Sequence, residues 1–104
     1  MTRLRLGFVG GGFITGFHLR ALRQVRGVEV AGLCSRTPPD ALAEYVREHD
    51  LGEGRVFASG REMIPHVDAV AICSPNFARL EIMEQIVAAV RDGAELRGVL
   101  CEKP

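Results

Sequence analysis

The chain has 104 residues, of which 47% are hydrophobic and 25% are charged, as is usual for one small globular domain. Thirteen basic and thirteen acidic residues give a formal net charge of zero, so neither nucleic acid nor an anionic membrane surface is expected as a partner. No apolar stretch approaches the roughly 18 residues that a membrane helix needs, and the first residues lack a signal-peptide pattern, so we expect a cytoplasmic location.

Strand-like apolar runs alternate with helical patterns along the whole chain. In chain order, the patterns predict a strand at residues 4–9, a helix at 13–25, a strand at 28–34, a helix at 41–49, a short strand at 55–58, one or two helical turns at 61–66, a strand at 67–73, a helix at 77–91 and a strand at 98–101. Asp40 or Thr37 is expected to cap the second helix. This alternation predicts an α/β domain with a doubly wound parallel sheet.

The helix at 77–91 carries a set of apolar residues on one side, namely Leu80, Met83, Ile86, Val87 and Val90. A doubly wound nucleotide-binding domain normally has six strands, whereas the pattern here stops after about five. We therefore expect residues 1–104 to be an incomplete domain, truncated after the fifth strand, from a longer protein. Such a chain would lack a substrate domain, would have no turnover alone, and would expose an apolar patch where the missing part packs.

A glycine-rich turn, Gly10-Gly11-Gly12-Phe13-Ile14-Thr15-Gly16, follows the first predicted strand and opens the first predicted helix, which is the context of a dinucleotide fingerprint. Gly10 permits the tight turn, and Gly12 lets a phosphate approach the backbone. The amides of Phe13 and Ile14 then point from the helix N-terminus toward the negative charge. Thr15 takes the third fingerprint position, where helix packs on strand. Such turns also occur as plain connections and in nucleoside-binding methyltransferases.

The end of the second predicted strand bears on the choice of cofactor. NAD enzymes place an Asp or Glu there, about 20 residues after the fingerprint, to bind the ribose hydroxyls. This chain has Ser35, followed by Arg36 and Thr37. A hydroxyl beside a guanidinium suits a 2′-phosphate, which a carboxylate would repel. We therefore predict a preference for NADP over NAD. The alternative is that Arg36 is solvated and either cofactor is accepted.

The cysteines and histidines carry little functional signal. Cys34, Cys73 and Cys101 are far apart and lack the paired spacing of a zinc site. Their odd number argues against a disulfide framework, so we interpret them as small buried strand residues. The three histidines have no partners at metal-ligand spacing, and we predict no metal site. His18 is interpreted as a packed or capped histidine of the first helix.

Two motifs follow the last two strands. The fourth predicted strand ends in Cys73-Ser74-Pro75-Asn76, and the fifth ends in Cys101-Glu102-Lys103-Pro104. Together with the glycine turn and His18, they resemble the motifs of the glucose-fructose oxidoreductase / inositol dehydrogenase / MocA family. The resemblance spans essentially the whole chain, and its specific part is the combination of the Ser-Pro-Asn turn with Glu-Lys-Pro.

The resemblance implies an NAD(P)-binding Rossmann domain that precedes a larger substrate domain, which often also forms the interface of a homo-oligomer. The implied reaction transfers hydride between NAD(P) and a hydroxyl-bearing carbon, commonly of a sugar or cyclitol. It further implies that Ser74, Pro75 and Asn76 lie along the nicotinamide ribose and that Glu102 supports the nicotinamide end. Lys103 is implied to be catalytic, because it would reach both the ribose and the substrate hydroxyl. A cationic nicotinamide nearby would lower the pKa of Lys103, which suits proton transfer.

The chain departs from the family pattern at Arg79, where the family often has a His, and in the longer connection at residues 91–97.

The sequence leaves three hypotheses for the function: an NADP-dependent oxidoreductase, a non-catalytic dinucleotide-binding or sensor module, and another Rossmann class such as a methyltransferase. The Glu-Lys-Pro motif argues against the third. The first two hypotheses can be distinguished only in the second domain. The resemblance implies a further acid/base pair there, an Asp and a His, and the absence of this pair would favour the binding module.

Overall fold

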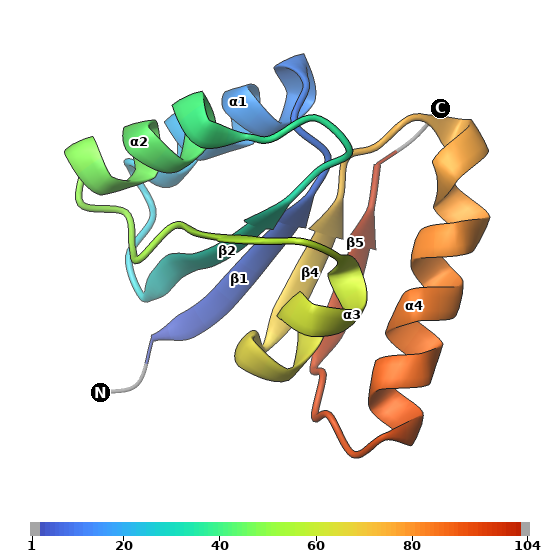
Figure 1. Cartoon of the computed structure of the whole chain (residues 1–104). Coiled ribbons are helices and arrows are strands. Elements are labelled where there is room, and N and C mark those ends of the chain that lie inside the picture. Colours follow the sequence, from blue (N-terminus) through green and yellow to red (C-terminus); the bar gives the residue numbers. More distant parts are fainter. Residues whose placement is uncertain (1–2, 103–104) are drawn as a thin grey trace.

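A computed structural model describes residues 3–102, which form a parallel sheet with helices on both faces (Figure 1). In chain order the elements are β1 (Leu4–Val9), α1 (Phe13–Leu22), β2 (Val28–Cys34), α2 (Asp40–Glu48), β3 (Arg55–Phe57), α3 (Gly60–Met63), the 3-10 turn η1 (Ile64–His66), β4 (Ala69–Ile72), the 3-10 turn η2 (Asn76–Ala78), α4 (Arg79–Arg91) and β5 (Gly98–Cys101). The strand order is β3-β2-β1-β4-β5, and all neighbours are parallel. This arrangement confirms the predicted doubly wound α/β fold with five strands.

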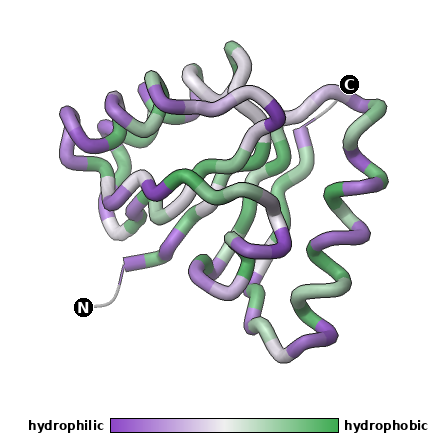
Figure 2. The backbone as a smooth tube through the Cα atoms, viewed as in Figure 1, coloured by the Kyte–Doolittle hydropathy of each residue, from purple (hydrophilic) through white to green (hydrophobic). Residues whose placement is uncertain are grey.

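The central strands β1, β2 and β4 lie between two apolar layers, and the strands are hydrophobic along most of their length (Figure 2). On one face, Phe8 and Leu33 pack with Leu19 of α1 and Val46 of α2. On the other face, residues of β4 pack with α3 and α4, and Met63 is fully buried there. Each fully buried apolar side chain of this size contributes roughly 1.5–3 kcal/mol, so the two layers fix the sheet that carries the turns described below.

Some predicted element ends were wrong. The first helix ends at Leu22 rather than continuing to Val25, which is exposed. The predicted side-chain cap of α2 is absent, because Pro39 occupies the N-cap position and makes no side-chain hydrogen bond. Asp40 is instead the first helical residue, where its negative carboxylate interacts favourably with the positive end of the helix dipole.

The buried face of α4 differs from the apolar side noted in the sequence. Ile82, Ile86 and Ala89 face the core, whereas Leu80, Met83, Val87 and Val90 are exposed. Only Ile86 of the predicted set is therefore in the core. The helix carries two apolar stripes, and the spacing of 3.6 residues per turn does not decide which stripe meets the sheet.

The cysteines differ in burial. Cys34 is buried, as expected, and Cys73 is half-buried, but Cys101 is exposed. The expectation of a buried residue is wrong for Cys101 because β5 pairs only with β4 and all four of its residues are exposed in the described part of the chain. Within residues 3–102, no helix combines the length and apolarity needed to cross a membrane.

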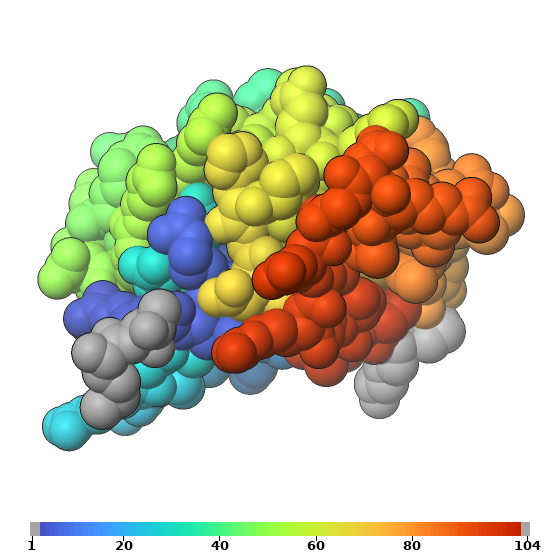
Figure 3. Space-filling view, turned by 90° about the horizontal axis from the view of Figure 1, so that it is seen from below, coloured from blue at the N-terminus to red at the C-terminus, as the bar shows by residue number. Residues whose placement is uncertain are grey.

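The amino ends of the strands form the face that Figure 3 shows, where the orange-red loop after α4 lies beside the yellow residues around η1 and β4. The backbone N–H of Arg97 donates to the Asp68 carbonyl at 2.6 Å, and the Asp68 N–H donates to the Arg5 carbonyl at 2.7 Å. These bonds connect β1, β4 and the entry to β5 at the edge opposite the glycine turn.

Candidate functional site

The glycine turn lies between the carboxyl ends of β2 and β4. The Gly10 N–H donates to the Cys34 carbonyl at 2.8 Å, and the Cys73 N–H donates to the Val9 carbonyl at 2.8 Å. Gly10 has a φ of +113°, and a Cβ there would lie 2.8 Å from the carbonyl carbon of Cys73. A side chain is therefore excluded both by the left-handed backbone and by contact with the neighbouring strand end.

Thr15 fixes the turn from inside the fold. Its side chain is fully buried, and its hydroxyl Oγ1 donates to the Gly10 carbonyl at 2.7 Å. The third fingerprint position thus packs α1 against the end of β1, as the sequence predicted. Gly16 has no comparable constraint, because a Cβ there would meet only Leu42 at an ordinary 3.7 Å.

The N-terminus of α1 is open toward the same side. Gly12 is the N-cap residue, no side chain caps the helix, and its first turn holds no acidic residue. A Cβ at Gly12 would meet no atom within 4 Å. The N–H groups of Phe13 and Ile14 belong to the first turn, where a helix provides no backbone acceptor. Open space in front of uncapped amides is the arrangement that binds phosphate groups.

A cleft of about 1040 Å³ extends from this turn across the carboxyl ends of the strands. It is lined by every predicted cofactor-binding residue that the structure describes, namely Gly10, Gly12, Phe13, Ile14, Ser35, Arg36, Ser74, Pro75, Asn76 and Glu102. Lys103 lies outside the described residues. In open α/β sheets, ligands bind at the carboxyl ends of the strands, at the topological switch point where the strand order reverses.

Sequence reasoning missed part of the cleft wall. The loop of Ala58, Ser59 and Gly60 lines the cleft after β3. Its signal was the Ser59-Gly60-Arg61-Glu62 pattern, since the Glu62 N–H donates to the Ser59 hydroxyl at 3.2 Å and begins α3. That pattern predicts a helix start but does not by itself predict a ligand.

Phe77 was also missed. Its ring is 75% exposed, and the guanidinium carbon of Arg36 lies 5.6 Å from the ring centroid, within the range of a cation–π contact. Arg36 follows β2 and Phe77 lies in η2 after β4, so the contact spans the end of β1 that lies between these strands. Arg36 therefore lies over the cleft wall.

Glu102 and Ser74 lie at the β4–β5 end of the cleft. A carboxylate oxygen of Glu102 lies 3.0 Å from His18 Nε2, and the Glu102 carbonyl accepts a hydrogen bond from Arg79 Nη2. His18, which the sequence suggested was a packed helix residue, thus also contacts a predicted site residue. Among the described residues, Ser74 Oγ and Arg79 Nε are the buried side-chain polar atoms without a hydrogen-bond partner.

Two thiols of the cleft wall remain protonated near neutral pH. Burial raises the pKa of the Cys34 thiol, and the charge of Glu62 raises it further. Burial also raises the pKa of Cys73, and this effect exceeds the lowering by the Thr15 hydroxyl. Neither thiol has the lowered pKa of a catalytic nucleophile.

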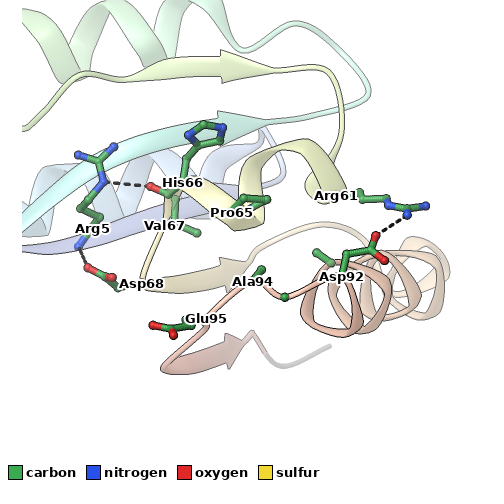
Figure 4. Close-up of a pocket in the computed structure, with 11 residues that line it drawn as sticks. Arg5, Arg61, Pro65, His66, Val67, Asp68, Asp92, Ala94 and Glu95 are labelled. Atoms are coloured by element: carbon green, nitrogen blue, oxygen red, sulfur yellow. Dashed lines mark hydrogen bonds and ion pairs between the residues drawn. The ribbon is translucent and has the colours of Figure 1, made fainter.

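A second hollow, of about 730 Å³, lies at the opposite edge of the sheet (Figure 4). Arg5 donates from Nε to the His66 carbonyl at 3.0 Å and from its backbone N–H to Asp68 at 2.8 Å, and Arg61 pairs with Asp92 at 2.6 Å. These bonds connect β1 to the start of β4, and α3 to the end of α4, around the hollow.

Comparison with known proteins assigns the family. Residues 4–104 match the model of the GFO/IDH/MocA family, described as an oxidoreductase family with an NAD-binding Rossmann fold. The chain belongs to this family, as its motifs predicted, and it forms the NAD-binding Rossmann domain.

Similar proteins agree with this assignment. The rhizopine catabolism protein MocA of Rhizobium meliloti is 33% identical over 109 residues, which cover 100% of this chain and 30% of that protein. The structure of scyllo-inositol dehydrogenase from Lactobacillus casei with bound NAD(H) and scyllo-inositol matches with a TM-score of 0.73 and 25% identity, over 99% of this chain and 28% of that one. UDP-N-acetylglucosamine 3-dehydrogenase GnnA from Acidithiobacillus ferrooxidans shares the fold, with a TM-score of 0.75 at 24% identity, over 100% of this chain and 31% of that one. The chain thus spans about 30% of the length of the curated relative.

Proposed function

We propose that this chain binds a nicotinamide dinucleotide within an oxidoreductase that transfers hydride to or from a hydroxyl-bearing carbon of a sugar or cyclitol. The observation that carries the proposal is the cleft at the carboxyl ends of the strands, where the two strand-end motifs meet the glycine turn. The substrate class is supported by the inositol ligand of the Lactobacillus casei neighbour and by the role of MocA in rhizopine catabolism.

The residues present fit the pyrophosphate of such a cofactor. The space in front of Gly12 is open, and the first-turn amides of Phe13 and Ile14 have no capping side chain. We expect these amides and the positive end of α1 to bind the phosphate oxygens. Thr15 acts indirectly, because its bond to Gly10 fixes the turn.

The other end of the cleft fits the nicotinamide ribose. The unpartnered Ser74 hydroxyl and the amide of Asn76 supply hydrogen-bonding groups there, and Glu102 lies beside them on the next strand end. The bound nicotinamide supplies the hydride acceptor or donor. We propose that Lys103 binds the substrate hydroxyl and accepts or returns its proton.

The adenosine end supports a preference for NADP. Ser35 and Arg36 line the cleft, and no carboxylate pairs with Arg36 among residues 3–102. Its guanidinium lies over the face of Phe77, an arrangement that leaves the N–H groups at its edge available to a 2′-phosphate. The Lactobacillus casei neighbour was solved with NAD(H), so the cofactor preference of this chain has to be measured directly.

The remaining parts of the proposal concern the longer protein. A second domain would supply the substrate pocket and the interface of a homo-oligomer, as the family resemblance implies. The three free cysteines agree with a reducing, cytoplasmic compartment. The proposal requires no nucleic-acid or membrane partner.

Titration of NADPH and NADH into the chain, read by nicotinamide fluorescence, tests this function. We expect both to bind, NADPH about tenfold more tightly, which corresponds to about 1.4 kcal/mol. Arg36→Glu should reverse the preference. Arg91→Glu makes the same charge change at an exposed residue outside the cleft and should leave the preference unchanged. Tighter NADH binding would overturn the NADP assignment, and failure to bind either cofactor would overturn the proposed function.

A further inference from the structure

Glu102 is held by three contacts from three different elements. Its backbone N–H donates to the Ile72 carbonyl of β4 at 3.0 Å, which continues the pairing of β4 with β5. Its carboxylate lies 3.0 Å from His18 Nε2 of α1, and its carbonyl accepts from Arg79 Nη2 of α4. The amide, the side chain and the carbonyl of this one residue are therefore each fixed separately.

The two side-chain contacts reach Glu102 from opposite faces of the sheet, because α1 and α4 lie on opposite faces (Figure 1). The His18 ring is itself held by two aromatic neighbours, with ring centroids 6.2 Å away at both Phe8 and Phe17. The Arg79 side chain is half-buried against the β5 end.

Helix stability does not explain the position of Arg79. It is the first residue of α4, where the positive end of the helix dipole disfavours a cation. Its Nε atom is also buried without a hydrogen-bond partner, which is unfavourable for a charged group. The bond from Arg79 Nη2 to the Glu102 carbonyl is the favourable interaction that Arg79 makes in this position.

We infer that Arg79 is a positioning residue, which fixes the backbone carbonyl of Glu102 and thereby the nicotinamide end of the cleft. The inference rests on the proposed function. The Glu102 N–H is bonded to β4 and its carboxylate contacts α1, so the Arg79 bond fixes the remaining polar group of this residue, its carbonyl.

The test compares the whole dinucleotide with its adenosine diphosphate part. NADH affinity of the full chain is measured by nicotinamide fluorescence, and the affinity for ADP, which lacks both the nicotinamide ring and its ribose, is measured by calorimetry. Arg79→Met keeps much of the side-chain length but removes the donors, whereas Arg79→Lys keeps a donor. Thermal unfolding of each variant checks that the fold is retained.

Arg79→Met should weaken NADH binding roughly five- to tenfold, as expected for loss of a charged hydrogen bond, and reduce the fluorescence change on binding. ADP affinity should stay within about twofold, and Arg79→Lys should restore part of the NADH affinity. Equal losses for both ligands would show a general structural role and overturn the inference, as would no change in either. If Arg79→Met fails to fold, the test uses Arg79→Lys, which must then weaken NADH binding more than ADP binding. If the unaltered chain binds neither ligand, the proposed function and this inference both fail.

Discussion

Thr15 donates a hydrogen bond from its buried hydroxyl to the Gly10 carbonyl at 2.7 Å. The bond connects the first turn of α1 to the residue that leaves β1, so the helix start and the glycine turn form one unit. The geometry of the amides that face the cleft depends on this connection, because they lie between the two bonded residues.

Thr15→Val tests this connection with little change in side-chain volume. It should destabilise the fold by roughly 1–3 kcal/mol, because the Gly10 carbonyl loses its buried donor. Urea unfolding followed by circular dichroism measures the loss. Thr15→Ser, which keeps the hydroxyl, should be affected less. If the two variants lower the free energy of unfolding equally, packing of the side chain stabilises the turn and the hydrogen bond does not.

Gly10→Ala should destabilise the fold by about 2 kcal/mol or more, because the backbone is left-handed there and the new Cβ would contact Cys73. Gly16→Ala is the matched control within α1, where a methyl group meets only Leu42 at 3.7 Å. Since alanine favours a helix, the control should be neutral or stabilising by up to about 1 kcal/mol. Equal unfolding free energies for the two variants would contradict the assignment of strain to Gly10.

The cysteines should react with iodoacetamide in the order of their exposure and thiolate content. Cys101 is exposed and should be alkylated first. A raised pKa means that less thiolate is present at a given pH, so Cys34 and Cys73 should react slowly at pH 8 and faster as the pH rises past the ordinary value of 9.0. Peptide mass spectrometry over a pH series measures each rate. Fast labelling of Cys34 below pH 8 in the folded chain would refute the burial of its thiol.

The exposed stripe of α4, formed by Leu80, Met83, Val87 and Val90, should make the isolated chain self-associate. Sedimentation velocity at increasing concentration is expected to show larger species. Replacement of Leu80 and Val87 together by glutamine should reduce them, because these residues are 71% and 44% exposed and neither belongs to the core. Glu84→Gln, an exposed change on the same helix, is the control. A monomer at all concentrations would contradict the expectation.

Much of the site was predictable because of where the motifs lie. Ser35 and Glu102 directly follow β2 and β5, Ser74 lies two residues after the end of β4, and parallel strands bring their carboxyl ends to one edge of the sheet. The glycine turn was predictable because a left-handed residue and an open N-cap each require a residue without a bulky side chain. These inferences need only the order of the elements.

Other features depend on packing that the sequence does not encode locally. The buried face of α4 was ambiguous because Ile82 and Leu80 lie on different apolar stripes of one helix. The sequence marked Arg79 as a departure from the family pattern but did not predict its contact, since the acceptor is a backbone carbonyl, which every residue has. The approach of Phe77 to Arg36 depends on how two loops fold over β1.

The central claim is that the uncapped N-terminus of α1 binds the pyrophosphate of the cofactor, and Gly12→Asp tests it most directly. Aspartate is a favourable N-cap residue, and its side chain would enter open space. Its carboxylate would accept hydrogen bonds from the amides proposed for the phosphate and would repel that phosphate. Gly12→Asn has a similar size without the charge and serves as the control.

The decisive measurement is the affinity of Gly12→Asp for NADPH and NADH, together with its free energy of unfolding. The account predicts that the variant is at least as stable as the unaltered chain but binds either cofactor at least tenfold more weakly, a loss of about 1.4 kcal/mol or more. Asparagine should cause a smaller loss. A stable Gly12→Asp variant that binds both cofactors with unchanged affinity would contradict the account.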